Sequence, residues 1–131
     1  MTASHGGVSV ILRSGDYESA HYALALASAA LAVNKPAVLF FTMGGIGALM
    51  GPPPQLEDWQ RDERNRVRGV GDFETLLSAC VELGARFIVC EMGLRSLGLE
   101  TSSLRRDIPC TIAGIVTLLE ETKPGMHLVT L

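Results

Sequence analysis

Cys90 is the residue of this sequence whose type and position best suit chemistry. It ends an apolar run, Arg86 to Cys90, that is predicted to be a β-strand, and a short helical stretch follows it directly. Ligands and catalytic groups in open α/β sheets gather at the carboxyl ends of strands, so we expect this thiol to face a crevice. The N–H groups that begin a helix favour the thiolate, which is the form that attacks sulfur. The alternative is an inert cysteine that packs as a small apolar side chain.

Two residues are candidates for supporting roles beside this thiol. Glu91 opposes a thiolate electrostatically unless a cation such as Arg95 offsets it. His21, near the start of the first predicted helix, would be an acid/base group if it pointed into the crevice. Its alternative role is that of a half-exposed partner at an interface.

The other two cysteines are weaker candidates. Cys110 lies in the next predicted strand, so it is a possible second thiol that resolves or relays from Cys90 if the strand tips are neighbours. Its alternative role is that of a core residue. Cys80 shares an apolar helix face with Phe73, Leu76 and Leu77 and is expected in the core.

The remaining crevice candidates are small or polar positions at predicted strand ends: Ser14, Gly44, Gly45, Glu91, Met92 and Gly93. The glycine-rich run from Gly44 to Gly47 has neither the Gly-x-Gly-x-x-Gly spacing nor a P-loop lysine. It is expected to permit a tight turn, or close approach by another backbone or a small ligand. No cofactor is expected. A metal site is not expected either, because there is no Cys-x-x-Cys pair and His5, His21 and His127 are scattered.

Five apolar runs and four helical stretches position these residues. Strands are predicted at Val8 to Leu12, Ala37 to Thr42, Arg86 to Cys90, Pro109 to Ile112 and His127 to Leu131. Helices are predicted at Tyr17 to Val33, from Asp72 to Gly84, at about Met92 to Gly98 and at Ala113 to Glu121. Such alternation is typical of an open, mainly parallel α/β sheet of flavodoxin or Rossmann type with helices on both faces. We therefore expect one α/β domain over residues 1–131.

Two segments are unusual for a monomer of this class. The first helix, Tyr17 to Val33, is apolar nearly all the way round, which favours burial of its outer side against another subunit. The alternative is that its alanines simply tolerate exposure. Residues 51–71 form a long charged loop or arm, with a possible helix from Leu56 to Asn65 and Trp59 as its large apolar anchor.

Bulk composition excludes several classes of protein. The net charge is −3 and no basic cluster is present, which excludes a nucleic-acid groove. The most apolar run, Ala20 to Val33, is shorter than the ~18 residues that a membrane span needs. Three cysteines with no export signal in Met1 to Gly7 indicate free thiols and a cytoplasmic location.

Three segments together resemble the DsrE-like family, the DsrE/DsrF sulfur-relay-related proteins. They are Ser14-Gly15-Asp16 with His21, the run Val38 to Gly45, and the strand, turn and helix from Phe87 to Leu99; Ile112 to Ile115 also fits. The resemblance implies a three-layer α/β/α domain with a five-stranded parallel sheet, assembled as a trimer or hexamer. In some members a cysteine accepts sulfane sulfur as a persulfide and passes it to a partner thiol, and Cys90 is the matching position. Residues 51–71 depart from the family pattern.

The first hypothesis for function is therefore a sulfur-carrier or sulfurtransferase-like protein with Cys90 as nucleophile, Arg95 and His21 in support, and a sulfur donor or acceptor protein as partner. The second is a non-catalytic oligomeric module that binds a small ligand or protein at the strand-end crevice. The third, a nucleotide or flavin binder, would show itself by the yellow colour of a bound flavin.

Overall fold

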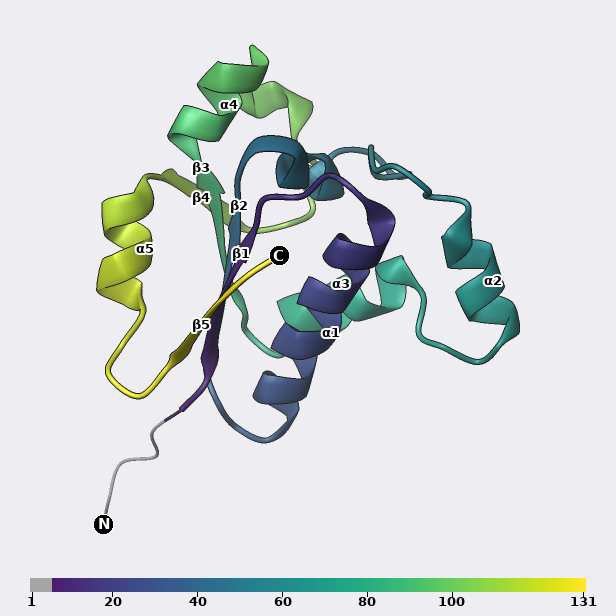
Figure 1. Ribbon diagram of the computed structural model, residues 1–131, viewed down its shortest axis with the longest axis horizontal. Coiled ribbons are helices and arrows are strands. Elements are labelled where there is room, and N and C mark those ends of the chain that lie inside the picture. The colour runs from purple at the N-terminus through teal and green to yellow at the C-terminus, as the bar shows by residue number, and fades with distance from the viewer. Residues whose placement is uncertain (1–5) are drawn as a thin grey trace.

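A parallel sheet of five strands forms the centre of the structure, a computed structural model that describes residues 6–131 (Figure 1). The strands are β1 (Val8–Leu12), β2 (Ala37–Phe41), β3 (Arg86–Cys90), β4 (Cys110–Ala113) and β5 (His127–Thr130). Their order is β4-β3-β2-β1-β5, and every neighbouring pair is parallel. The expected α/β fold is confirmed, with β4 beginning one residue after the predicted Pro109.

The order of the strands determines which face each helix covers. From β1 to β4 the chain steps in one direction, and right-handed crossovers place α1 (Tyr17–Ala32) and α3 (Phe73–Glu82) on the same face. The last connection runs back across the sheet to β5, so α5 (Ile115–Glu121) lies on the opposite face (Figure 1). The short helix α4 (Glu91–Leu97) stands at the carboxyl end of the sheet.

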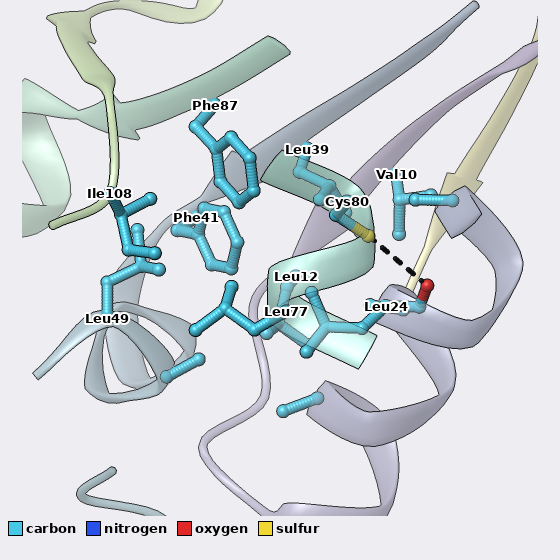
Figure 2. Packing of buried hydrophobic residues seen from close by; sticks show 14 of the residues in the cluster. Val10, Leu12, Leu24, Leu39, Phe41, Leu49, Leu77, Cys80, Phe87 and Ile108 are labelled. Carbon is cyan, nitrogen blue, oxygen red and sulfur yellow. Dashed lines mark hydrogen bonds between the residues drawn. The ribbon is translucent and has the colours of Figure 1, made fainter. Parts of the chain in front are cut away.

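Two cores of unequal size result from this arrangement. The main core lies between the sheet and α1 and α3 and includes stacked Phe41 and Phe87 (Figure 2). The segment between β3 and β4 adds Leu104 and Ile108 to it. The small core lies on the α5 face and consists of the buried residues Val38, Phe40, Ile88, Cys90 and Leu118.

The apolar character of α1 is explained largely within one subunit. Ala20, Ala23, Leu24 and Ala27 are buried, and α3 packs alongside the helix. The Sγ of Cys80 on α3 lies 3.5 Å from the carbonyl oxygen of Leu24 on α1 (Figure 2). The exposed apolar remainder of the helix and its cap consists of Tyr22, Ala29, Ala32 and Val33. The predicted subunit contact therefore concerns only this remainder.

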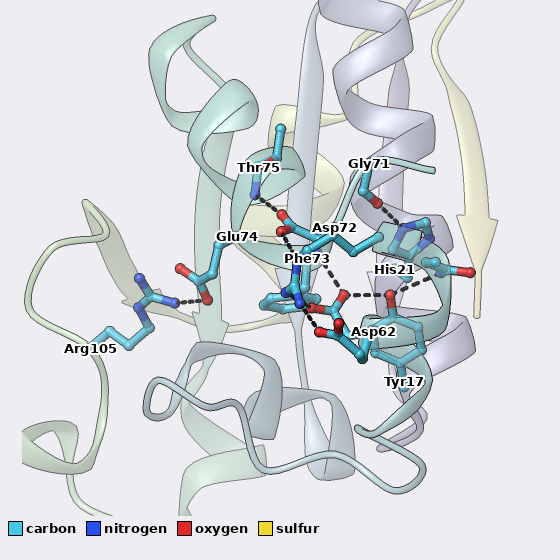
Figure 3. Close-up of polar contacts among 12 residues, drawn as sticks. Tyr17, His21, Asp62, Gly71, Asp72, Phe73, Glu74, Thr75 and Arg105 are labelled. Carbon is cyan, nitrogen blue, oxygen red and sulfur yellow. Dashed lines mark hydrogen bonds and ion pairs between the residues drawn. The ribbon is translucent and has the colours of Figure 1, made fainter. Parts of the chain in front are cut away.

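Residues 51–71 are fastened to the domain by a polar network. The segment follows a 3-10 helix, η1 (Met43–Leu49), and contains α2 (Arg61–Val67), somewhat later than the predicted Leu56 to Asn65. The buried carboxylate of Asp62 accepts hydrogen bonds from the Tyr17 hydroxyl at 2.6 Å and the Phe73 amide at 2.8 Å (Figure 3). The Trp59 ring contacts the rings of Tyr17 and Phe73 edge-on. The segment is thus an arm that is packed against the starts of α1 and α3.

No helix within residues 6–131 has the length and apolar character required to cross a lipid bilayer.

Candidate functional site

Cys90 occupies the predicted position at the end of a strand. It is the last residue of β3 and the N-cap of α4. Successive side chains of a strand point to opposite faces, and Ile88 and Cys90 belong to the small core whereas Phe87 and Val89 belong to the main core. The thiol therefore points to the face that α5 covers.

The expectation of an open thiol is wrong for a single subunit. Cys90 is only 1% exposed and is packed in the small core with Phe40, Ile88 and Leu118. Its neighbour on β4, Ala113, is the last strand residue before Gly114 and α5. The reversal of the last crossover, which sequence alone did not reveal, places a helix over this position.

The expected support from the following helix is also absent. Cys90 has extended backbone geometry as N-cap, but its side chain makes no capping hydrogen bond to α4. The first residue of α4, Glu91, is exposed, as is Met92. The sulfur is therefore held by apolar packing.

The other two thiols lie on the opposite side of the sheet. Cys110 pairs with Phe87 in the β3–β4 register and packs against the main core, three positions short of the tip of β4 at Ala113. A relay within one chain from Cys90 to Cys110 is thus contradicted, because the sheet separates them. Burial raises the pKa of Cys110, and it raises the pKa of Cys80 to about 11, so both remain thiols at neutral pH.

The two supporting candidates lie outside the small core that holds the Cys90 thiol. The Nε2 of His21 lies 2.7 Å from the carbonyl oxygen of Gly71, and the ring packs against Tyr17, so His21 fastens the 51–71 arm on the α1 face (Figure 3). Arg95 is exposed in the last turn of α4 and forms no ion pair within the described chain. The predicted roles of both residues in a shared crevice with Cys90 are not supported by this placement.

At the strand ends, where a crevice was expected, glycines allow neighbouring backbones to pack in direct contact. The backbones of Gly15 and Gly44 touch, since a Cβ on Gly44 would lie 3.0 Å from the Gly15 nitrogen. Gly45 packs against the carbonyl of Leu12, and a Cβ on Gly93 would lie 2.8 Å from the Met43 nitrogen. Close approach by another backbone, one of the predicted roles of this glycine run, is confirmed.

Ser14 lies at the same edge of the sheet. Its backbone N–H donates to the carbonyl oxygen of Leu131 at 3.2 Å, next to the Arg13 amide that donates to the same atom at 2.8 Å. A pocket of about 260 Å³ lies near the far end of α4 and is lined by Gly44, Gly47, Met50, Gln55, Leu97 and Leu99. Cys90 is not part of its wall.

Across residues 6–131, no three His, Cys, Asp or Glu side chains form a metal-binding group; His5 lies outside the described residues.

The residues that hold α5 to the sheet were not singled out from the sequence. Leu118 is the buried residue of α5, and Glu121 at the end of the same helix accepts two hydrogen bonds from the Arg86 guanidinium, at 2.7 and 2.8 Å. Arg86 begins β3, the strand that Cys90 ends. Arg86 and Glu121 are far apart in sequence, so no local pattern predicts their contact. The order of the strands in the sheet brings them together.

Comparisons with known proteins agree with this fold. The model of the DsrE/DsrF-like family matches residues 7–131. The ychN protein from E. coli has a similar structure, with a TM-score of 0.62 and 17% identity over 95% of this chain and 99% of that one. MTH1491 from Methanobacterium thermoautotrophicum, described as a protein of unknown function, has a TM-score of 0.60 and 16% identity over 98% of this chain and 100% of that one. At such identities the likeness shows the fold alone. No curated protein matches the chain.

Proposed function

Because the chain belongs to the DsrE/DsrF-like family, whose members are generally linked to sulfur relay, we propose that it carries sulfane sulfur on Cys90. The observation that supports Cys90 most directly is its environment. It stands at the carboxyl end of β3 on the thinly covered face, whereas Cys80 and Cys110 lie in or against the main core. Of the two fully buried thiols, Cys90 therefore lies under the thinner cover, whereas Cys110 is half-buried on the other side of the sheet.

The proposed reaction is an exchange of one sulfur atom. The Cys90 thiolate attacks the outer sulfur of a donor persulfide; a bond forms between the two sulfurs, the donor S–S bond breaks, and the donor leaves as a thiolate. A partner thiolate then removes the outer sulfur from Cys90 in the same manner. No net oxidation occurs and no cofactor takes part. The proposal places the protein in the cytoplasm, where thiols stay reduced.

Transfer through the protein tests this proposal. The protein is loaded with inorganic polysulfide, freed of excess reagent and mixed with a small thiol, and the released sulfide is measured. We expect one equivalent from the wild type and from Cys110→Ser, and none from Cys90→Ser. Equal release from Cys90→Ser and the wild type would refute the assignment.

Burial of the Cys90 thiol favours a second candidate function, a non-catalytic oligomeric module that binds a small ligand or protein at the carboxyl end of the sheet. The pocket beside Gly44 and Leu97 is the site that such a ligand would use. In that case Cys90 is a core residue, and the wild type releases no sulfide in the loading experiment.

We further propose that the functional form is a homo-oligomer, a trimer or hexamer as the family resemblance implies. The outer side of α1 and the edge strand β5 enclose an open apolar groove of about 420 Å³. Its walls come from Gly7, Val8, Leu26, Ala29, Ala30, Val33, Lys35, His127 and Val129. A second copy of the chain is its proposed occupant, because the exposed apolar remainder of α1 lines it.

A further inference from the structure

The face of the sheet that holds Cys90 is covered by little besides α5. This helix has seven residues, and among them only Leu118 is buried. Ile115, Val116 and Leu119 point away from the core, with exposed fractions of 49%, 69% and 57%. By contrast, α1 and α3 jointly cover the other face and bury residues along most of their length. Helices with few buried contacts open locally at lower cost than the rest of a domain.

Polar contacts that hold α5 to the sheet are concentrated at its C-terminal end. Arg86 forms the double hydrogen bond to Glu121 and also donates to the Thr111 hydroxyl at 2.6 Å. The hydroxyl of Thr122, the C-cap residue, donates to the carbonyl oxygen of Leu118 at 2.8 Å and shares a hydrogen bond of 2.8 Å with the buried Ser9 hydroxyl. At the other end of α5, the N-cap residue Gly114 has no side chain that could cap the helix. Hydrogen bonding to Arg86 lowers the pKa of Glu121, so the pair is ionised at neutral pH.

The alternative path to the sulfur, from the carboxyl end of the sheet, is closed more firmly. There α4 packs against η1 through Gly93, whose missing side chain allows contact with Met43 and Thr42. Moving α4 would break this close backbone packing and disturb the main core, to which Ile46 and Leu94 belong. Moving α5 disturbs only the small core.

From these observations we infer that α5 is a removable cover over Cys90, held closed by Arg86–Glu121 and Thr122–Ser9, and that its detachment from the sheet is the step that admits a sulfur donor or acceptor. This inference rests on the proposed function for its purpose, but the motion itself is independent of sulfur chemistry. It predicts that weakening either contact speeds access to Cys90 without loosening the main core.

The three cysteines allow this to be tested in one protein. Trypsin places each in a separate peptide, because cleavage sites at Arg68, Arg86, Arg95 and Arg106 divide them. Native protein is alkylated with N-ethylmaleimide and the rate is measured for each peptide. In Glu121→Gln and in Thr122→Val we expect the Cys90 rate to rise about five- to tenfold, the factor for loss of about one net hydrogen bond, while the Cys80 rate stays unchanged. The rate follows the open population when closing is fast.

Glu74→Gln is the matched control, since it removes one carboxylate charge from an ion pair with Arg105 on the opposite face. It should leave the Cys90 rate unchanged. The inference is overturned if neither α5 variant changes the Cys90 rate, if the Cys80 rate rises in parallel, or if Glu74→Gln has the same effect. Sulfide release tests the proposed function separately. If Cys90 releases sulfide normally but neither α5 variant changes its alkylation rate, the inference that α5 is a cover is refuted and the proposed sulfur transfer stands. If the variants speed alkylation but the protein releases no sulfide, the proposed sulfur transfer is refuted and the motion of α5 stands.

Discussion

Asp62 shows how much one buried carboxylate contributes to this molecule. Its side chain receives the Tyr17 hydroxyl from α1, the Phe73 amide from the start of α3 and, at 3.2 Å, the guanidinium of Arg66 from its own helix. Burial and the neighbouring Asp62 raise the pKa of Tyr17 above its ordinary value, so the phenol is protonated and donates at neutral pH. The 51–71 arm, α1 and α3 therefore share a single polar junction.

Replacement of this carboxylate is expected to be costly. Asp62→Ala leaves a buried hydroxyl and a helix-terminal amide without their acceptor, and should lower the free energy of unfolding by about 2–4 kcal/mol. Glu63→Ala, which removes an exposed partner of the same Arg66, should have a much smaller effect. Urea denaturation of both variants checks this; equal losses would show that Asp62 is not a junction.

At the scale of single elements, α3 illustrates how a helix of this chain is delimited. Asp72 is its N-cap and accepts the Thr75 amide at 2.9 Å, and Gly84 follows its C-cap with a φ of 87°. Hydrogen bonds from Thr75 and then from Arg66 lower the pKa of Asp72 to about 2. The ionised cap thus stabilises the folded state.

The cap should make part of the stability depend on pH. Because the pKa falls from 3.8 in the unfolded chain to about 2 in the folded state, the contribution of the cap is complete above about pH 5 and is lost as the pH falls toward 2. Asp72→Ala should cost about 1 kcal/mol in neutral buffer, and the difference from the wild type should shrink toward pH 2. Asp72→Asn, which caps without a charge, should retain most of the neutral stability. A difference between wild type and Asp72→Ala that is constant with pH contradicts the assignment.

These elements were predictable from sequence because their signals are local. Asp72 and Gly84 mark the two ends of α3, Pro36 follows the first helix, and the apolar run up to Cys90 specifies a buried strand. Which helix covers the Cys90 thiol, in contrast, could not be predicted from local signals. It depends on strand order and on the reversed last crossover, which involve residues far apart in sequence. The burial of Asp62 could not be predicted for a related reason. In the sequence it is one of several charged residues in a row, and nothing nearby distinguishes the one that is buried.

At the scale of the whole molecule, the two faces of the sheet have different properties. The α1 face is thick, contains the main core and ends at an open apolar groove beside β5. The α5 face is thin and contains Cys90. In the proposed assembly a second copy covers the groove, and α5 stays free to move.

The proposed assembly predicts a specific effect of charge in the groove. Val33, 65% exposed on its wall, becomes buried against the second copy, so Val33→Glu should convert the oligomer largely to monomer. Leu83→Glu is the control, because Leu83 is also exposed and apolar but lies at the end of α3, outside the groove. Sedimentation velocity measures both. A monomeric wild type, or equal dissociation by both variants, contradicts the assembly.

The most direct measurement is to locate the sulfur atom. Native wild-type protein is exposed briefly to inorganic polysulfide, free thiols are blocked, and the three cysteine-containing tryptic peptides are weighed. We predict the added mass of one sulfur atom on the peptide from Phe87 to Arg95, which contains Cys90, and on neither of the others. Sulfur on the Cys80 or Cys110 peptide instead, or on none of the three, would contradict the proposal that this protein carries sulfur on Cys90.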